Sequence, residues 1–161
     1  MIYIYNAGPL FSEAEIKQRK AEGESLWALK GTQKDFFVAN PIDLPFDNSK
    51  ALSAQTIFNE DVKHVDLANV FFFELASGDT GTMVELGMAI EKFRQGKSIK
   101  IYPVFFDLRL SRNQASGIEC PVGFNSYVVG SLTSQNIQTY DSFGKALQAF
   151  KTDFNIFSQL E

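Results

Sequence analysis

Short apolar segments alternate along the chain with longer amphipathic stretches, and this alternation separates strands from helices. The apolar segments, which end at polar or turn-forming residues, lie at residues 2–6, 35–39, 70–75, 98–106 and 125–130. The amphipathic stretches lie at residues 12–30, 51–67, 82–94 and 140–154. The pattern therefore predicts five strands and four helices, with a strand preceding most of the helices.

The order of these elements indicates the fold class. The segment Val70-Phe71-Phe72-Phe73 is apolar at every position, as a parallel strand buried on both faces requires. Strands that alternate with helices form a parallel sheet covered on both sides. We predict an α/β fold with three layers, in which helices cover both faces of a doubly wound, mainly parallel five-stranded sheet. Ligands bind such sheets beyond the carboxyl ends of the strands, which directs attention to residues 6–11 and 76–82.

Length, charge and composition restrict the class of protein further. The 161 residues fit a single domain, residues 1–161, with a core of useful size. The net charge of −4 leaves no basic surface for a nucleic-acid backbone, and no apolar run approaches the ~20 residues of a membrane helix. No positively charged leader precedes the first strand. We expect a soluble, cytoplasmic protein without nucleic-acid or membrane partners.

Histidine and cysteine are too scarce to carry most of the chemistry. The single His64 and the single Cys120 cannot form a zinc site of His and Cys ligands or an intrachain disulfide. His64 is expected on the solvated side of its helix, and neither residue is assigned a role. The glycines at positions 78, 81 and 87 lack the spacing of a dinucleotide fingerprint. We expect no metal and no cofactor, so acid–base chemistry falls to the nineteen aspartates and glutamates.

Glu85 is the most unusual of these acidic residues. It is the one carboxylate near the start of the otherwise apolar stretch 83–90, about one turn into the predicted helix. Burial raises the pKa of such a carboxyl, whereas the N-terminus of the helix favours its ionised form. A partly desolvated carboxylate at a strand-to-helix loop could act as a nucleophile. The alternative is a surface glutamate that stabilises the helix dipole, and the pattern alone does not decide between them.

Asp61 and Asp79 are two further candidates. At helical spacing, Asp61 shares a stripe with Phe58, Val62 and Val65, which places it on the inward face of its helix. A buried carboxylate without a partner is costly, so Asp61 either caps neighbouring backbone or has a function. Asp79 lies six residues before Glu85 in a glycine-flanked loop. It could face the same pocket, or it could simply be a turn residue.

Three motifs together resemble the nucleoside 2-deoxyribosyltransferase family. They are Ile-Tyr-Asn-Ala-Gly-Pro-Leu-Phe at 4–11, Asn-Glu-Asp at 59–61, and Asp-Thr-Gly-Thr-Met-Val-Glu-Leu-Gly at 79–87. Gly-Phe-Asn at 123–125 fits a fourth family element, so the resemblance spans residue 2 to about residue 130. The family implies a flavodoxin-like fold and a role in nucleotide salvage. Its substrates are deoxyribonucleosides and free purine or pyrimidine bases, between which a 2-deoxyribosyl group moves without a cofactor.

The resemblance also implies roles for individual residues. Glu85 matches the family nucleophile, and Asp61 matches an aspartate that can protonate the departing base. Asp79 matches the acidic residue that holds the sugar hydroxyls. Tyr5 matches the tyrosine that orients the nucleophile, and Phe11 matches an aromatic side chain beside the base. The implied reaction is a retaining double displacement through a glycosyl-enzyme, which follows the two-carboxylate logic of retaining glycosidases.

Two more positions are carried over from the same motifs. Gly8, in the Ala-Gly-Pro segment, is expected at the substrate. Asn125 matches an asparagine that family members insert into a neighbouring subunit's site, which implies a homo-oligomer. The chain ends without the terminal aromatic residues of members whose C-terminus reaches a neighbouring site. Base selection from the loop at residues 45–47 cannot be read from the sequence.

Other functions stay open at this point. Deoxynucleotide N-glycosidases of the same fold transfer the sugar to water, but they commonly carry a serine at the position of Asp79 to receive a phosphate. An aspartate there repels a phosphate dianion, which favours nucleosides. Hydrolysis of nucleosides, a non-catalytic nucleoside-binding module, and a structural domain with an accidental pocket are the remaining alternatives.

Overall fold

The structure is a computed structural model, and it describes residues 1–31, 34–45, 51–108 and 124–156. Several sequence-based expectations concern residues outside these ranges. They are those on Phe46, Asp47, Cys120, Gly123 and the C-terminal residues 157–161.

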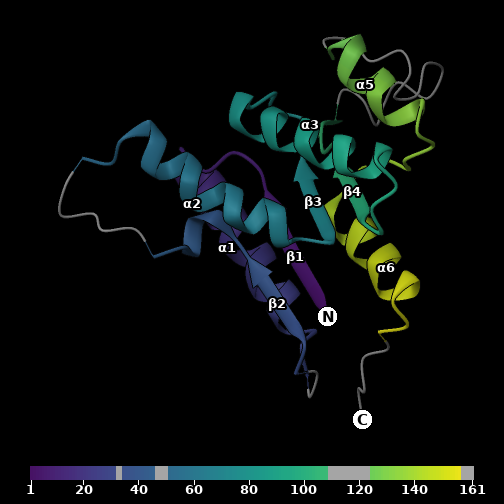
Figure 1. Ribbon diagram of the computed structural model, residues 1–161, viewed down its shortest axis with the longest axis horizontal. Coiled ribbons are helices and arrows are strands. Elements are labelled where there is room, and N and C mark those ends of the chain that lie inside the picture. The colour runs from purple at the N-terminus through teal and green to yellow at the C-terminus, as the bar shows by residue number, and fades with distance from the viewer. Residues whose placement is uncertain (32–33, 46–50, 109–123, 157–161) are drawn as a thin grey trace.

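Four parallel strands form the sheet in the described part of the chain, in the order β2-β1-β3-β4. The strands are β1 (Ile2–Ala7), β2 (Phe36–Ala39), β3 (Val70–Glu74) and β4 (Lys100–Val104). The chain runs from β1 outward to β2, then crosses back to β3 and continues to β4 (Figure 1). In the shared register Tyr5 pairs with Phe71, which pairs with Ile101. The predicted α/β fold with a doubly wound parallel sheet is confirmed.

The predicted fifth strand at residues 125–130 is wrong, because this segment belongs to a helix, α5 (Ser126–Thr133). Asn125 caps the helix, since its side-chain Oδ1 accepts a hydrogen bond from the Tyr127 backbone N at 2.9 Å. Val129 and Leu132, three residues apart, then lie buried on one helical face. Beyond β4, the described sheet continues only as a single parallel bridge between Val104 and Tyr140.

The remaining helices begin and end close to their predicted bounds. They are α1 (Glu13–Trp27), α2 (Ala54–Leu67), α3 (Thr80–Arg94) and α6 (Phe143–Asp153), with a short 3-10 helix η1 (Pro41–Asp43). Side-chain oxygens cap the N-termini of all five α-helices in the described ranges, at Ser12, Ser53, Asp79, Asn125 and Ser142. The capping box that the sequence predicts between Ser12 and Glu15 is present. None of the helices in the described ranges is long and apolar enough to cross a membrane.

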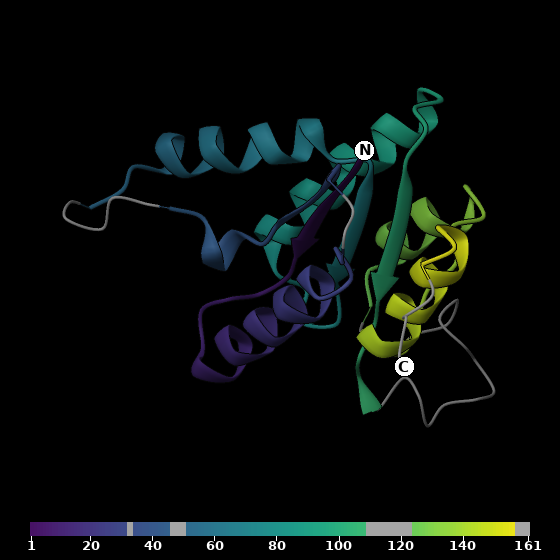
Figure 2. The same cartoon turned by 90° about the horizontal axis from the view of Figure 1, so that it is seen from below.

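Helices cover both faces of the sheet, so the predicted three layers are confirmed. Because side chains alternate along a strand, Tyr5 and Phe71 face one side, and Ile4 and Phe72 face the other. The first side packs against α2, α3 and α5, and the second packs against α1 and α6. Figure 2 shows α1 and α2 on opposite sides of the strands. Odd-numbered residues of β1 therefore contribute to one layer, and even-numbered residues contribute to the other.

Helix α2 packs against the sheet mainly through its C-terminal half. Val65 is buried, whereas Phe58, which the sequence places on the inward stripe, is 52% exposed. This part of the prediction is wrong because the N-terminal half of α2 projects beyond the strands (Figure 1). The same helix carries His64, which is also not solvated as expected. Its Nδ1 lies 2.6 Å from the Tyr3 hydroxyl, and its ring stacks on Phe37.

Candidate active site

Tyr5 and Glu85 form the centre of the candidate site, although they are 80 positions apart in the sequence. Tyr5 is fully buried in β1. Because side chains alternate along the strand, that of Tyr5 points toward the layer that contains α3. Its hydroxyl donates a hydrogen bond of 2.6 Å to Glu85 Oε1. Such a short distance is typical of a hydroxyl that donates to a carboxylate. The bond fixes one oxygen of Glu85 and leaves the other for a reaction partner.

The loop between β3 and α3 determines where Glu85 lies. Gly78 has a φ of +70°, a conformation that glycine adopts without strain. The turn allows Asp79 to cap α3, and Asp79 Oδ2 accepts hydrogen bonds from the backbone N and the Oγ1 of Thr82, both at 2.8 Å. Helix α3 begins at Thr80, so Glu85 lies in its second turn. The strand, the turn and the cap together bring Glu85 to the carboxyl end of the sheet.

Burial raises the pKa of Glu85 to about 7. The nearby carboxylates of Asp61 and Asp79 act in the same direction, because like charges disfavour ionisation. The hydrogen bond from Tyr5 opposes them, since it stabilises the ionised form. The pKa of Tyr5 is itself raised by its burial and then by Glu85, so Tyr5 keeps its proton and acts as a donor at neutral pH.

Asp61 lies on α2, partly buried, and its Oδ1 is a buried atom without a hydrogen-bond partner among the described residues. Burial raises the pKa of Asp61 to about 6, and the neighbouring Glu60 carboxylate raises it as well. Buried polar atoms nearly always have a partner, so an unsatisfied oxygen marks a position where a ligand could donate a hydrogen bond. A carboxyl with such a pKa can also carry a proton near neutral pH.

The structure thus brings four of the expected residues together. Asp61 and Asp79 both act on the pKa of Glu85, Asp61 also acts on that of Tyr5, and Tyr5 is bonded to Glu85. The group contains a nucleophile candidate held by a hydroxyl, a carboxyl that can hold a proton, and a carboxylate at a helix N-terminus. This combination suits cleavage of a glycosidic bond, which needs one anionic and one protonated carboxyl.

Three expected residues lie outside this group. Phe11 is 79% exposed in the loop between β1 and α1, where its backbone N donates to Glu15 Oε2. Gly8 faces α1, and a Cβ there would lie 2.3 Å from Arg19 Nη1. Asn125 is exposed at the start of α5, beside the 87% exposed Tyr127. Among the described hydrogen bonds, none joins these three residues to Tyr5 or Glu85.

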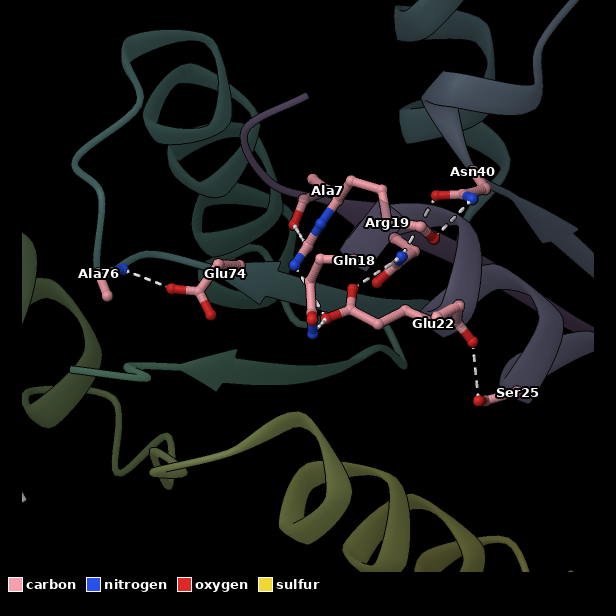
Figure 3. A network of polar contacts seen from close by, with 10 residues as sticks. Ala7, Gln18, Arg19, Glu22, Ser25, Asn40, Glu74 and Ala76 are labelled. Atoms are coloured by element: carbon pink, nitrogen blue, oxygen red, sulfur yellow. Dashed lines mark hydrogen bonds and ion pairs between the residues drawn. The ribbon is translucent and has the colours of Figure 1, made fainter. Parts of the chain in front are cut away.

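A buried polar network on the other face of the sheet has no counterpart among the residues predicted from the sequence. Arg19 and Glu22 of α1 lie within it, 3% and 4% exposed, together with Asn40 (Figure 3). Asn6 is hydrogen-bonded to both Glu22 and Asn40. The polar composition of α1 predicts a surface helix, so it gives no indication that two of its charged side chains are buried. The one available signal is Asn6, a polar residue within an otherwise apolar strand. Within the described ranges, no three His, Cys, Asp or Glu side chains form a group that could hold a metal ion.

Three solved structures share this fold over most of their length. A crystal structure of a conserved protein from Enterococcus faecalis V583 matches 95% of this chain and 99% of its own, with 22% identity and a TM-score of 0.71. A 2-deoxyribosyltransferase from Leishmania mexicana matches 99% and 100%, with 21% identity and a TM-score of 0.59. A 2-deoxyribosyltransferase from Bacillus psychrosaccharolyticus matches 90% and 89%, with 20% identity and a TM-score of 0.54. The fold is therefore one that deoxyribosyltransferases adopt.

The sequence comparison gives the family. The family model described as nucleoside 2-deoxyribosyltransferase matches residues 4–118, so the chain belongs to this family, and the resemblance in its motifs is confirmed. An uncharacterized protein from Ureaplasma parvum serovar 3 is 30% identical over 122 residues, which are 70% of this chain and 75% of that protein. Family and fold together indicate a deoxyribosyltransferase-like enzyme, for which nucleosides and bases are the implied substrates.

Proposed function

We propose that the protein transfers the 2-deoxyribosyl group from one nucleobase to another through a covalent intermediate on Glu85. The observation that carries the proposal is the 2.6 Å hydrogen bond from Tyr5 to Glu85, with Asp61 near enough to raise the pKa of Glu85. A carboxylate held by one oxygen can present the other to C1′ of a sugar. A second carboxyl that retains a proton can donate this proton to the base, at the other end of the bond from C1′.

In the first step, the free oxygen of Glu85 forms a bond to C1′ while the bond from C1′ to the base nitrogen breaks. The electron pair of that bond leaves with the base, and Asp61 donates a proton to it. The transition state resembles an oxocarbenium ion, which the negative charge of Glu85 stabilises. The products of this step are a free base and a deoxyribosyl ester of Glu85.

In the second step, a nitrogen of another base attacks C1′ and the ester bond to Glu85 breaks. The attacking base loses its proton to Asp61, which restores both carboxyls to their starting states. Two displacements at C1′ give overall retention of configuration and ping-pong kinetics. Water can replace the second base, so slow hydrolysis is expected as a side reaction.

Asp79 supports nucleosides rather than nucleotides as substrates. Its Oδ2 caps α3, which places a carboxylate at the helix N-terminus where a phosphate would otherwise bind. We assign its Oδ1 to the sugar hydroxyls. Phe11, in the loop after β1, is assigned to the base side of the same pocket. Gly8, whose Cβ position faces Arg19, is assigned to the substrate through its backbone. The exposed Asn125 is assigned to the site of a neighbouring subunit, in a homo-oligomer.

Base exchange tests the proposal directly. The protein is incubated with deoxyinosine and excess free adenine, and the products are separated by chromatography. We expect deoxyadenosine in the wild type and none in Glu85→Gln. The matched control is Glu91→Gln, an exposed glutamate on the same helix, which should leave the rate unchanged. Free hypoxanthine without deoxyadenosine would instead identify a hydrolase.

A further inference from the structure

A buried ion pair lies beneath the carboxyl end of β1, on the face of the sheet opposite Tyr5. Arg19 Nη2 donates to Glu22 Oε1 at 2.8 Å, and both side chains are almost fully buried. Gln18 Nε2 donates to the same Glu22 oxygen at 2.7 Å, and Asn6 Nδ2 donates to Glu22 Oε2 at 3.3 Å. Figure 3 shows this pair between α1 and the strands. Two buried charges on one helix call for a physical reason.

The pair contacts three consecutive residues at the end of β1. Glu22 accepts from the Asn6 side chain, and Arg19 Nη1 donates to the Ala7 carbonyl oxygen at 3.4 Å. Gly8 comes next, and only a residue without a Cβ fits so close to the guanidinium. Successive residues of a strand point to opposite faces, so the backbone that this pair holds is the one that presents Tyr5 to the other side.

Asn40 extends the same network to the end of β2. Its Oδ1 accepts from Asn6 Nδ2 at 3.2 Å, and its Nδ2 donates to the Arg19 carbonyl oxygen at 3.0 Å. A second donation from Nδ2 reaches Asp43 Oδ2 at 2.7 Å. The ends of β1 and β2 and the middle of α1 are therefore joined by side chains at the edge of the sheet where the loop to Phe11 begins.

Stability alone does not account for the pair. Removing two charges from water costs more than a buried pair usually returns. Arg19 Nε and Asn6 Oδ1 are both buried without a partner among the described residues, which adds to that cost. Burial also raises the pKa of Glu22, despite the opposing effects of Arg19, Gln18 and Asn6. A network that is costly and placed behind the candidate site points to a role in geometry.

We propose that Arg19 and Glu22 are positioning residues of the active site, which fix the end of β1 so that Tyr5 meets Glu85 and residues 8–11 enter the site. The inference rests on the proposed function for its catalytic consequence. Arg19 and Glu22 do not touch the substrate in this account. They act through Asn6, Ala7 and Gly8.

The double variant Arg19→Met/Glu22→Met tests the inference, because it removes both charges and leaves the net charge unchanged. Replacing a buried pair with apolar side chains is often neutral for stability, so we expect a folded protein with a melting temperature near that of the wild type. We expect kcat to fall about ten-fold or more, since misplacement of a reacting group by about 1 Å can cost ~10²-fold. KM changes less. Glu13→Met/Lys17→Met removes an exposed ion pair of the same helix, and it should leave kcat unchanged.

Arg19→Lys is the second variant, and it covers the case in which the double variant does not fold. It keeps a positive charge opposite Glu22 but loses the planar fork that spans Glu22 and Ala7. We expect a kcat between those of the wild type and the double variant. If either variant, the double variant or Arg19→Lys, is folded and has the wild-type kcat, the inference is wrong.

A measurement without substrate separates this inference from the proposed function. The ¹³C NMR titration of Glu85 is compared in the wild type and the folded double variant. The pKa of Glu85 is set by burial, Tyr5, Asp61 and Asp79, and Tyr5 is the group that lowers it. Loosening of the Tyr5 bond therefore raises the pKa in the double variant. An unchanged pKa overturns the positioning role, whereas a wild type without transferase or hydrolase activity overturns the proposed function alone.

Discussion

At the scale of single residues, Glu85 combines two properties that oppose one another. A nucleophile must be ionised, but burial raises the pKa of Glu85 to about 7. Tyr5 offsets part of this effect by donating to Oε1, and it favours the anion at the position where C1′ would approach. The folded protein therefore holds a carboxylate in a setting that disfavours its charge. In the proposed mechanism, this carboxylate attacks C1′ more readily because little water solvates it.

Replacing Glu85 with Gln should stabilise the fold at neutral and alkaline pH while it abolishes transfer. A carboxyl whose pKa rises from 4.5 to about 7 on folding destabilises the native state increasingly as pH rises between these values. Glu85→Gln removes this penalty, which is roughly 1 to 3 kcal/mol above pH 7. Thermal unfolding should show a higher Tm at pH 8 and no gain below pH 4. A lower Tm at pH 8 would contradict the assigned burial penalty.

The pH dependence of kcat/KM should be bell-shaped, with an optimum between about pH 6 and pH 7. Activity falls on the acid side because Glu85, with a pKa of about 7, becomes protonated. It falls on the alkaline side because Asp61, with a pKa of about 6, loses the proton that the base needs. The two limbs belong to the pair as a whole because the carboxyls interact. A rate that is constant from pH 5 to pH 9 would contradict these roles.

Asp61→Asn changes this profile in a defined direction. The alkaline limb should disappear, and the rate should fall by about 10² to 10⁴, the usual contribution of a general acid. The remaining acid limb should report the ionisation of Glu85 alone, because the limbs of the wild-type profile belong to the carboxyl pair. The profiles of the two proteins, measured with the same deoxynucleoside, test both effects. An alkaline limb that persists in Asp61→Asn would contradict the role of Asp61 as the proton donor.

At the scale of elements, the relative position of α2 and α3 determines how near Asp61 lies to Glu85. Lys92 of α3 joins the two helices, because its Nζ donates to the carbonyl oxygens of Val65, Asp66 and Ala68 at 2.8, 2.9 and 3.2 Å. These carbonyls belong to the last turn of α2, where a positive charge also interacts favourably with the helix dipole.

Lys92→Met should lower the free energy of unfolding by about 1 to 3 kcal/mol, since two partly buried carbonyls and one exposed carbonyl lose a charged donor. Urea denaturation measures this loss. Lys97→Met, an exposed lysine just beyond α3, is the matched control and should change the stability little. Equal stabilities of the two variants would show that Lys92 does not clamp α2.

Sequence patterns predict some of these elements much better than others. The apolar run at Val70 predicts β3 and its parallel burial, because continuous burial leaves a continuous apolar signal. Val128 and Val129 favour a strand locally, yet Asn125 caps a helix there, because a side-chain cap and helical packing outweigh β propensity. Phe58 follows the helical period but is half-exposed. Periodicity describes a face of an element and does not say how far the neighbouring layer extends.

Some features of the candidate site can likewise be predicted from the sequence, and others cannot. Glu85 and Asp61 stand out in the sequence as acids at apolar positions, since burying a carboxylate is unusual. The pairing of Tyr5 with Glu85 follows from the register of β1 with β3 and from the turn at Gly78, so it needs the folded chain. The family motif leads to the expectation that Tyr5 orients Glu85, and the structure shows the hydrogen bond between them. The buried Arg19 gives no signal in the sequence, because charged residues occur along most of the length of its helix.

At the scale of the whole molecule, the fold places the candidate active site and the buried ion pair of α1 on the two faces of one strand. The odd positions of β1 carry Tyr5 toward α3, and Asn6 faces the network on α1. Exposed side chains at the start of α5, with Asn125 and Tyr127 among them, are available to a second copy of the chain. In the proposed oligomer each site combines Glu85 of one subunit with the partner's Asn125.

Mixing two inactive variants tests this arrangement. Asn125→Ala and Glu85→Ala each lack one component, but a hybrid dimer contains one complete site. Random exchange of subunits should restore up to about a quarter of the wild-type activity, because half of the dimers are hybrids with one intact site each. Wild-type activity in Asn125→Ala alone, or no recovery after exchange is shown by size and mass, would contradict the shared site.

The covalent role of Glu85 is tested most directly by the intact mass of the protein. The mass is measured after the protein reacts with a deoxynucleoside in the absence of an acceptor base. We expect an increase by one deoxyribosyl group, which peptide mapping should assign to Glu85. The added mass should disappear when free adenine is supplied, as deoxyadenosine forms, and it should be absent from Glu85→Gln. Base exchange without any adduct, an adduct on another residue, or exchange by Glu85→Gln would contradict the covalent role of Glu85.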